Sequence, residues 1–565
     1  MFVTEFIVNR TMNFQNFRTK SLVFLFFTLI FLILLIKIKS FFNFYDEGFA
    51  MFGATRVLNG DAPYKDFWAI YPPGQFYNLA MIIKLFGANL LNARIYDTLI
   101  RLLAVIGVYL ITKRTAPHRL ALLAAAIAGF LLASAGFYSY AVFPALALGL
   151  WSIYAWLRYT EKGNKAWLLL SGALLGIAIF IRWDIGSYAA IGVLAAGYLA
   201  LLLPGLRASP PDDRRNTQFY LAAWFAPLKT LAWILLPMLS IALLSYTLIG
   251  FLSGWNNLFE QVFYFPTSVL HSVRWLPYPH LIPPDLVQWV PYYDLYVPKI
   301  NLPSEDWTRF YLPILTLGIS VVLLILKFIK ERASLNQGTF TLIALTLFGG
   351  LLFNQALSRY DLIHVTPASI LTFMAAVAFF HQFTANGVKT RLKNGVIALV
   401  VVLTVLYFAP ALKNLLVTMD TTPPWGCFSH LPIAGCVSLS PDQEHTAYFI
   451  QAFTQPSDPI FVGNQKHDRI FVNDIGLYYL AGRPSATRYH ELYPGVATTL
   501  PIQQEIVSEL KARDVQWIVL VKMWDSNEPN GSALSSGVTY LDDYLRSNYL
   551  QFAEYGIYKI YRKSS

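Results

Sequence analysis

Long apolar stretches recur along the chain up to Leu412, separated by polar segments. A helix needs ~20 apolar residues to cross a hydrocarbon core, and about eleven stretches come close to that length. The pattern therefore predicts a mainly α fold, a polytopic membrane helix bundle of about eleven spans. The predicted spans are Ser21 to Ile36, Ile95 to Thr112, Leu120 to Ala135, Tyr138 to Leu157, Ala166 to Ile181, Ser187 to Leu203, Leu228 to Leu252, Tyr311 to Leu326, Thr339 to Asn354, Pro367 to Phe383 and Gly395 to Leu412.

Basic residues predict which side of the membrane each loop faces. Lys and Arg in short loops stay cytoplasmic, and every second loop of this chain is basic. The stretch Phe76 to Phe86 is too short for a span and would break this alternation, so we expect a helix at the outer interface. We expect the protein in the plasma (inner) membrane. An odd number of spans then leaves the N-terminus cytoplasmic and the residues after Leu412 extracytoplasmic. The basic groups are Arg10, Arg18, Lys20; Lys113, Arg114, Arg119; Arg158, Lys162, Lys165; Arg207, Arg214, Arg215; Lys327, Lys330, Arg332; and Lys389, Arg391, Lys393.

The pattern changes after about Asp420, where apolar runs become shorter. We divide the chain into a transmembrane part, 1–420, and a small extracytoplasmic α/β domain, 421–565, which is large enough to fold alone. Its predicted elements are strands at Pro459 to Gly463 and Val515 to Val521, helices at Gln503 to Arg513 and Tyr540 to Ser547, and a strand pair over Phe552 to Tyr561.

Composition agrees with a membrane protein. Hydrophobic residues make up 56% of the 565 positions, charged residues make up 13% and mean hydropathy is +0.48, whereas a soluble protein carries roughly one quarter charged residues. Cytoplasmic loops that face anionic lipid account for much of the net charge of +11. No nucleic-acid partner is needed to explain it.

Two outer loops are long, 37–94 and 253–309. The second is rich in Pro, which blocks long helices, and in Trp and Tyr, which favour the headgroup layer. It is either a lid at the membrane surface or an ordered connection with no role in binding. The chain has two cysteines, Cys427 and Cys436, which is too few for a disulfide framework or a zinc ribbon. Both are expected on the oxidising side, where a local bridge and two free thiols are both compatible with the sequence.

Charged residues of the membrane part collect at the predicted outer ends of spans. Arg binds a phosphate through two parallel hydrogen bonds, and a carboxylate takes a proton from an attacking hydroxyl. Such a set suits a lipid-borne anion. Ordinary alternatives are a solvated boundary for the acids, structural ion pairs for the arginines and a packing role for the histidine. The set consists of Asp46 and Glu47; Arg94, Asp97 and Arg101; Arg182 and Asp184; and Arg359, Asp361 and His364.

The first outer loop contains three short motifs: Tyr45 to Gly48 (YDEG), Ala62 to Phe67 (APYKDF) and Tyr71 to Gly74 (YPPG). They resemble the first external loop of GT-C glycosyltransferases, most closely family 39, the bacterial relatives of protein mannosyltransferases and lipid A aminoarabinose transferases. The resemblance implies a sugar donor carried on a polyprenyl phosphate and a site on the outer face of the membrane.

The resemblance also implies roles for single residues. Asp46 would be the catalytic acid group that activates the acceptor, with Glu47 as its catalytic neighbour, and the donor phosphate would be held by Arg359, His364 and Arg182. We expect no cofactor and no metal, although a divalent ion is an alternative because carboxylates are suitable ligands. The residues expected to bind substrate or shape the site are Tyr64, Asp66, Tyr71, Pro73, Asp184 and Asp361.

The predicted function is transfer of a sugar to an acceptor lipid, glycan or protein by a single displacement that inverts the anomeric carbon. The alternative is a lipid transporter or flippase without chemistry. A transporter predicts ionisable residues near the bilayer midplane and a repeat between two halves. The sequence contains no such repeat, and apart from Arg101 the interiors of the predicted spans are nearly free of charge.

Overall fold

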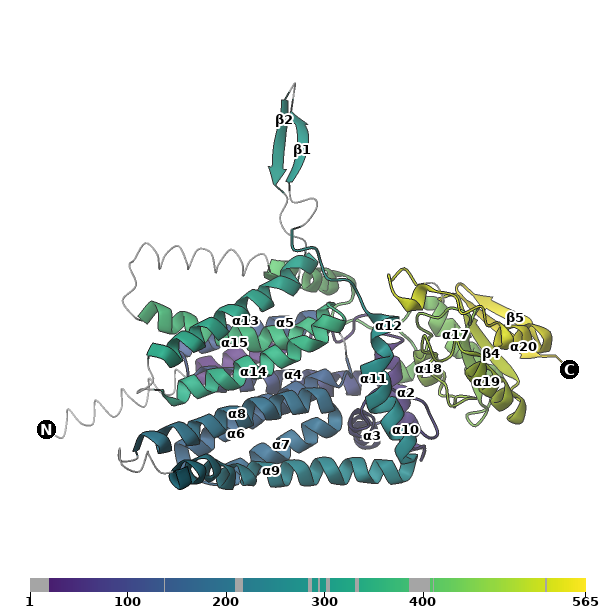
Figure 1. Cartoon of the computed structure of the whole chain (residues 1–565). Helices are drawn as coiled ribbons and strands as arrows, with labels where there is room; N and C mark the ends of the chain where they lie inside the picture. The colour runs from purple at the N-terminus through teal and green to yellow at the C-terminus, as the bar shows by residue number, and fades with distance from the viewer. Residues whose placement is uncertain are drawn as a thin grey trace, which may run out of the picture.

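The structure is a computed structural model that describes residues 20–136, 138–208, 217–282, 287–292, 295–300, 305–330, 335–385, 407–409, 411–523 and 526–564. Long helices form a bundle, and a small α/β domain of C-terminal residues lies at one end of it (Figure 1). Among the described helices, seven are long and apolar enough to cross a membrane, and two shorter apolar helices accompany them. The chain is an integral membrane protein of mainly α fold.

Each predicted span within the described residues coincides with a helix of the bundle. The span predicted at Gly395 to Leu412 lies mostly outside the described residues, so the total number of spans stays a prediction. The helices are Lys20–Leu34, α4 (Leu90–Thr112), α5 (His118–Ala135), α6 (Val142–Lys162), α7 (Ala166–Ile181), α8 (Trp183–Ala208), α9 (Thr217–Ser253), α13 (Glu305–Lys330), α14 (Gln337–Ser358) and α15 (Leu362–Ala385).

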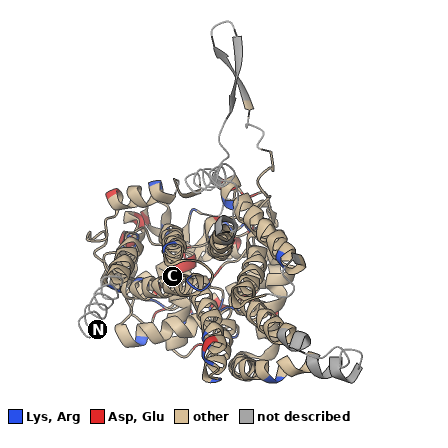
Figure 2. Cartoon of the chain, turned by 90° about the vertical axis from the view of Figure 1, so that its left-hand side faces the viewer, with Lys and Arg blue, Asp and Glu red and all other residues tan. Residues whose placement is uncertain are grey.

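The interior of the bundle is apolar, with Leu150, Val193 and Phe348 among its fully buried side chains. Figure 2, which views the helices end-on, shows few stretches of them coloured for charged residues. Lipid offers no hydrogen-bond partner to polar groups, and some of the buried ones pair with each other between helices. The hydroxyls of Ser152 on α6 and Ser171 on α7, for example, are 2.8 Å apart.

Two short helices follow the first membrane helix, α2 (Asp46–Leu58) and α3 (Gly74–Phe86). The short helix predicted over Phe76 to Phe86 is therefore present, and its position at the outer interface stays a prediction. Both helices lie at the end of the bundle that carries the C-terminal domain (Figure 1).

The described residues of segment 253–309 form several short elements before the long helix α13 begins at Glu305. They are α10 (Trp255–Phe259), a π-helical turn (Glu260–Tyr264), α11 (Phe265–Ser268) and α12 (Leu270–Arg274), followed by an antiparallel hairpin of β1 (Val287–Tyr292) and β2 (Leu295–Ile300) that projects away from the helices (Figure 1). The first part contacts the first outer loop through Gln261, whose Nε2 donates to the Tyr64 carbonyl at 2.9 Å and whose Oε1 accepts from Ala69 N–H at 3.0 Å.

The C-terminal domain is a four-stranded sheet in the order β3-β4-β6-β5 with helices packed on it. Strands β3 and β4 are parallel, and the pairs β4–β6 and β5–β6 are antiparallel. Every strand and helix predicted for this part of the chain is present. The elements are α17 (Pro441–Phe453), β3 (Ile460–Asn464), α18 (Gly476–Ala481), α19 (Leu500–Ala512), β4 (Trp517–Val521), α20 (Tyr540–Asn548), β5 (Tyr549–Tyr555) and β6 (Tyr558–Lys563).

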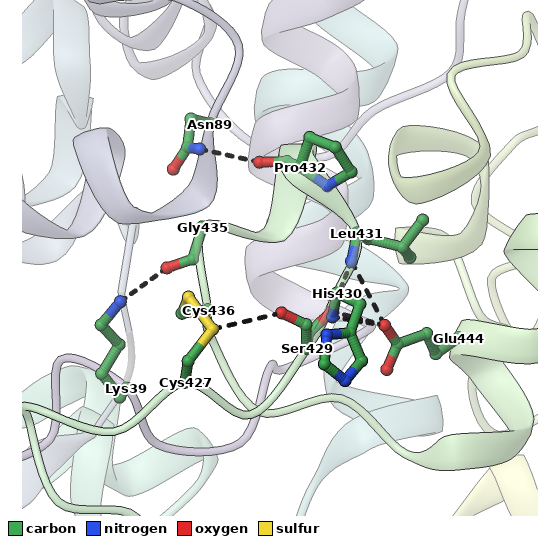
Figure 3. Close-up of a disulfide and its surroundings, with 10 residues drawn as sticks. All are labelled: Lys39, Asn89, Cys427, Ser429, His430, Leu431, Pro432, Gly435, Cys436 and Glu444. Atoms are coloured by element: carbon green, nitrogen blue, oxygen red, sulfur yellow. Dashed lines mark hydrogen bonds between the residues drawn. A yellow bond between two sulfur atoms is a disulfide. The ribbon is translucent and has the colours of Figure 1, made fainter.

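A disulfide joins Cys427 and Cys436, which resolves the choice between a bridge and free thiols. The loop that it closes contacts the membrane part (Figure 3). Lys39 Nζ donates to the Gly435 carbonyl at 2.7 Å, and Asn89 Nδ2 donates to the Pro432 carbonyl at 2.9 Å. The bridged loop therefore connects the C-terminal domain to the segments around the first outer loop.

Candidate active site

The first turn of α2 fixes Asp46 where the bundle meets the C-terminal domain. Asn43 Oδ1 accepts from the backbone N–H groups of Tyr45 and Asp46 at 3.1 and 2.9 Å, and Asn43 Nδ2 donates to Asp46 Oδ2 at 3.0 Å. A carboxylate at a helix N-terminus is also favoured by the helix dipole. The hydrogen bonds with Asn43 thus fix the position of Asp46. Because Asp46 is only half-buried, part of its side chain stays open to solvent.

The surroundings of Asp46 change its proton affinity. Burial raises the pKa of Asp46 above its ordinary value, although the hydrogen bond from Asn43 and the nearby Arg274 and His364 oppose this effect. The charge of Asp361 adds to the increase. A raised pKa makes this carboxylate a better proton acceptor near neutral pH.

Glu47 makes a different contact from that of Asp46. Its two oxygens accept from Arg94 Nε at 2.8 Å and Nη2 at 2.7 Å, and both side chains are almost completely buried. Arg94 also donates to the carbonyls of Ile38 and Ser40 at 3.1 and 2.7 Å. This geometry favours a supporting role for Glu47, which anchors α2 and the preceding loop to α4, over the catalytic role expected from the sequence.

Gly48 completes the motif because no side chain fits at that position. A Cβ atom there would lie 2.5 Å from the backbone nitrogen of Gly476 on α18. The same approach is held by the Gly476 N–H, which donates to the Phe44 carbonyl at 2.7 Å. The C-terminal domain therefore packs directly on the turn that carries Asp46.

The two other motifs of the first outer loop shape its fold. Tyr64 adopts a φ of 70°, is fully buried and donates its hydroxyl hydrogen to the Tyr71 carbonyl at 2.8 Å. Asp66 Oδ2 accepts from the Ala62 N–H at 2.7 Å and closes the turn between them. Pro73 caps α3. These contacts give Tyr64, Asp66 and Pro73 structural roles next to the site. Tyr71 belongs to the site itself, because its ring lies under the Arg182 guanidinium.

Arg182 lies between α7 and α8, and Asp184 lies in the first turn of α8. Arg182 Nε donates to Asp184 Oδ1 at 3.2 Å, and its guanidinium lies over the rings of Tyr71 and Tyr140 at 5.8 and 5.5 Å. Asp184 Oδ2 accepts from Gln355 Nε2 at 2.7 Å. Within the described part of the chain, Arg182 Nη1 is buried without a hydrogen-bond partner. The charge of Asp46 acts on both Tyr71 and Tyr140. Because the Arg182 guanidinium lies over the same two rings, Arg182 belongs to the same group as Asp46.

Arg359, Asp361 and His364 lie at the junction of α14 and α15. Asp361 accepts from Arg359 Nε at 2.9 Å and contacts His364 Nδ1 at 2.6 Å. Burial raises the pKa of Asp361, but His364 and Arg359 outweigh burial and lower it to about 2. Arg359 also forms a two-pronged ion pair with Glu528 of the C-terminal domain. Asp361 is therefore ionised, and most donors of Arg359 are already engaged.

The sequence assigned no role to two residues of this group, Arg274 and Glu491. Arg274 ends α12, and its guanidinium lies over the rings of Tyr45 and Tyr493 at 5.8 and 5.2 Å. Glu491, in the C-terminal domain, accepts from the Tyr45 hydroxyl at 2.6 Å. The run Arg488 to Glu491 resembles the external domain of related proteins but indicates no role, because Arg274 and Glu491 join Asp46 only when distant segments pack together.

The described residues include no group of three or more His, Cys, Asp or Glu side chains arranged to hold a metal ion. The site that the structure assembles consists of Asp46, an inner carboxyl at Glu491 and the cations Arg182, Arg274 and Arg359 with His364. All lie where the membrane helices meet the α/β domain.

In this structure a bundle of membrane helices is followed by an α/β domain, which packs on the turn of α2 that carries Asp46. Residues 71–209 match the family model described as dolichyl-phosphate-mannose-protein mannosyltransferase. No curated protein matches the chain. The match to the family model agrees with the resemblance that the first outer loop indicated, and it includes the last of the three motifs, Tyr71 to Gly74.

Solved structures that are similar to the chain include an ArnT and an oligosaccharyltransferase. ArnT from Cupriavidus metallidurans, bound to undecaprenyl phosphate, is 14% identical with a TM-score of 0.51, and the match covers 96% of this chain and 98% of that one. The Archaeoglobus fulgidus oligosaccharyltransferase in the apo form is 13% identical with a TM-score of 0.48, over 88% of this chain and 69% of that one. The chain shares the fold of ArnT.

Proposed function

We propose that the protein is a membrane glycosyltransferase that moves a sugar from a polyprenyl-phosphate donor to an acceptor lipid, glycan or protein on the extracytoplasmic face. The observation that carries this proposal is the half-buried Asp46 carboxylate, whose pKa is raised, beside a cluster of cations. The match to the mannosyltransferase family model and the lipid phosphate bound to the structurally similar ArnT support a lipid-linked donor.

In the proposed reaction, Asp46 takes the proton from an acceptor hydroxyl as that oxygen attacks the anomeric carbon. The bond between this carbon and the phosphate oxygen breaks on the opposite side. The polyprenyl phosphate leaves with the bonding electron pair, and the anomeric centre inverts. Asp46 then releases its proton to solvent, to which it is partly open. A positioned general base of this kind contributes about 10²–10⁴ in rate.

The cations near Asp46 would hold the negative charge of the phosphate. Arg182 has a buried donor available at Nη1, and Arg274 acts electrostatically on Asp46 together with His364. Because Arg359 is held by Glu528 and Asp361, it would contact the phosphate only with its remaining N–H or after Glu528 moves. We propose Arg182, Arg274 and His364 as the main contacts, with Arg359 as a further one.

The experiment is transfer of radiolabelled sugar from a panel of polyprenyl-phosphate sugars by the purified full-length protein in detergent. We expect label on an acceptor, or released by hydrolysis, with wild type. Asp46→Asn should lower kcat by at least ~100-fold while thermal stability and donor binding persist. The matched control is Asp543→Asn, which makes the same change at an exposed position of α20.

Two results would count against this proposal. Turnover retained in Asp46→Asn would remove Asp46 from the role of base. Donor binding without turnover in wild type, across the panel, would favour the transporter alternative, and lipid movement in liposomes would then be measured.

A further inference from the structure

Glu491 is a buried carboxyl group with only one of its oxygens engaged. Its side chain is 1% exposed. Oε1 accepts from the Tyr45 hydroxyl at 2.6 Å, whereas Oε2 is buried and has no hydrogen-bond partner among the described residues. In Glu47, the comparable buried carboxylate at the same junction, both oxygens are bound by Arg94. A purely structural carboxyl at Glu491 would be expected to resemble Glu47, since buried polar atoms are normally satisfied.

The backbone around Glu491 is held rigidly. Asn473, which is fully buried, donates from Nδ2 to the carbonyl of His490 at 2.9 Å and accepts at Oδ1 from the N–H of Leu492 at 2.9 Å. One side chain thus clamps both neighbours of Glu491. The C-terminal domain presents this carboxyl group in a fixed position, as a binding site requires.

The Glu491 carboxyl group belongs to the candidate active site. The charged and titratable groups that act on Glu491 are Tyr45, Arg274 and Asp46, and Tyr493 senses its charge in turn. Tyr45, Asp46 and Arg274 are partly exposed, whereas Glu491 is buried. Burial raises the pKa of Glu491 to about 8, with the hydrogen bond from Tyr45 and the charge of Arg274 opposing and the charge of Asp46 assisting. At neutral pH the carboxyl group is therefore protonated and can donate a hydrogen bond.

We propose that Glu491 is a substrate-binding residue supplied by the C-terminal domain, which donates a hydrogen bond through Oε2 to a phosphate oxygen of the lipid-linked donor. The inference rests on the proposed function for the identity of the ligand. It gives the α/β domain a direct part in the site, because without that domain the phosphate would lose one hydrogen-bond donor beside Arg274.

The test is binding of undecaprenyl phosphate to the purified full-length protein, measured from pH 6 to 9.5 with wild type, Glu491→Gln and Glu491→Ala. Glu491→Ala should bind at least ~10-fold more weakly than wild type at pH 7, a loss in the range expected when a hydrogen bond to a charged group is removed. Glu491→Gln should restore binding at pH 7, because its amide also donates. Wild type should lose affinity above about pH 8, where its carboxyl ionises beside the phosphate, and Glu491→Gln should not.

The proposal is overturned if folded Glu491→Ala binds like wild type, or if wild type and Glu491→Gln lose affinity in parallel above pH 8. The second comparison remains decisive even if Glu491→Ala does not fold. Binding is read separately from turnover, so a failure of Glu491 is distinguishable from a failure of the glycosyltransferase proposal. In the latter case, wild type would bind the lipid and transfer no sugar.

Discussion

Glu47 on α2 and Arg94 on α4 form a buried ion pair in which both carboxylate oxygens accept hydrogen bonds, at 2.8 and 2.7 Å. The pair lies one residue from Asp46, and the guanidinium also binds carbonyls of the chain that leads into α2. The position of Asp46 on α2 thus depends on the contact that its neighbour Glu47 makes with Arg94 on α4.

We expect Glu47→Gln to destabilise the protein by about 3–5 kcal/mol, because it leaves the buried charge of Arg94 without its partner. Thermal unfolding in detergent measures this effect. The control is Glu161→Gln, which removes a partly exposed ion pair with Arg114 and Arg158 and should cost about 1 kcal/mol or less. Equal losses of stability in the two variants would show that the buried Glu47–Arg94 pair stabilises the protein no more than the partly exposed pairs of Glu161.

Gly48→Ala tests the contact between α2 and the C-terminal domain. The new methyl group would meet the backbone of Gly476 at 2.5–2.7 Å, so the domain must shift, at a cost of roughly 1–3 kcal/mol. We expect faster proteolytic release of the C-terminal domain and reduced transfer. Gly318→Ala on α13 is the control, since a methyl group there meets no atom within 4 Å. Faster cleavage of both variants to the same extent would contradict the prediction.

Reduction of the disulfide should loosen the attachment of the C-terminal domain. Cys427 and Cys436 are nine residues apart, and closing a loop of this size contributes ~2.5 kcal/mol in the chain-entropy account. We expect reductant to lower the Tm of the wild-type protein. The double variant Cys427→Ser/Cys436→Ser should already have the lower Tm and be insensitive to reductant, and a reductant effect that persists there would assign the loss to another cause.

The sequence predicts most helices and strands because their signals are local. Apolar runs identify the membrane helices, and short buried runs identify β3 and β4. The sequence places acids and cations together at the predicted outer ends of spans, and in the structure the charges of His364 and Asp361 act on Asp46. The partners of these groups could not be predicted. Nothing local links Arg359 to Glu528 or Tyr45 to Glu491, since each pair forms only when the C-terminal domain packs on the bundle.

The raised pKa of Glu491 predicts how stability depends on pH. The pKa of Glu491 is about 8 in the folded protein, whereas the ordinary value of 4.5 applies to the unfolded chain. The folded state therefore favours the neutral acid. This stabilisation is complete below about pH 4.5 and is lost as pH rises through about 8. Between pH 6 and pH 9, wild type should lose on the order of 2–3 kcal/mol relative to Glu491→Gln, which does not titrate.

The measurement is Tm against pH for both proteins, taken as a difference so that groups other than Glu491 cancel. The difference between wild type and Glu491→Gln should move against wild type as pH rises from 6 to 9. Parallel curves would mean that Glu491 is already ionised at neutral pH in the folded protein. In that case Oε2 could only accept a hydrogen bond, and a phosphate oxygen beside it would be repelled, since like charges at close range are unfavourable.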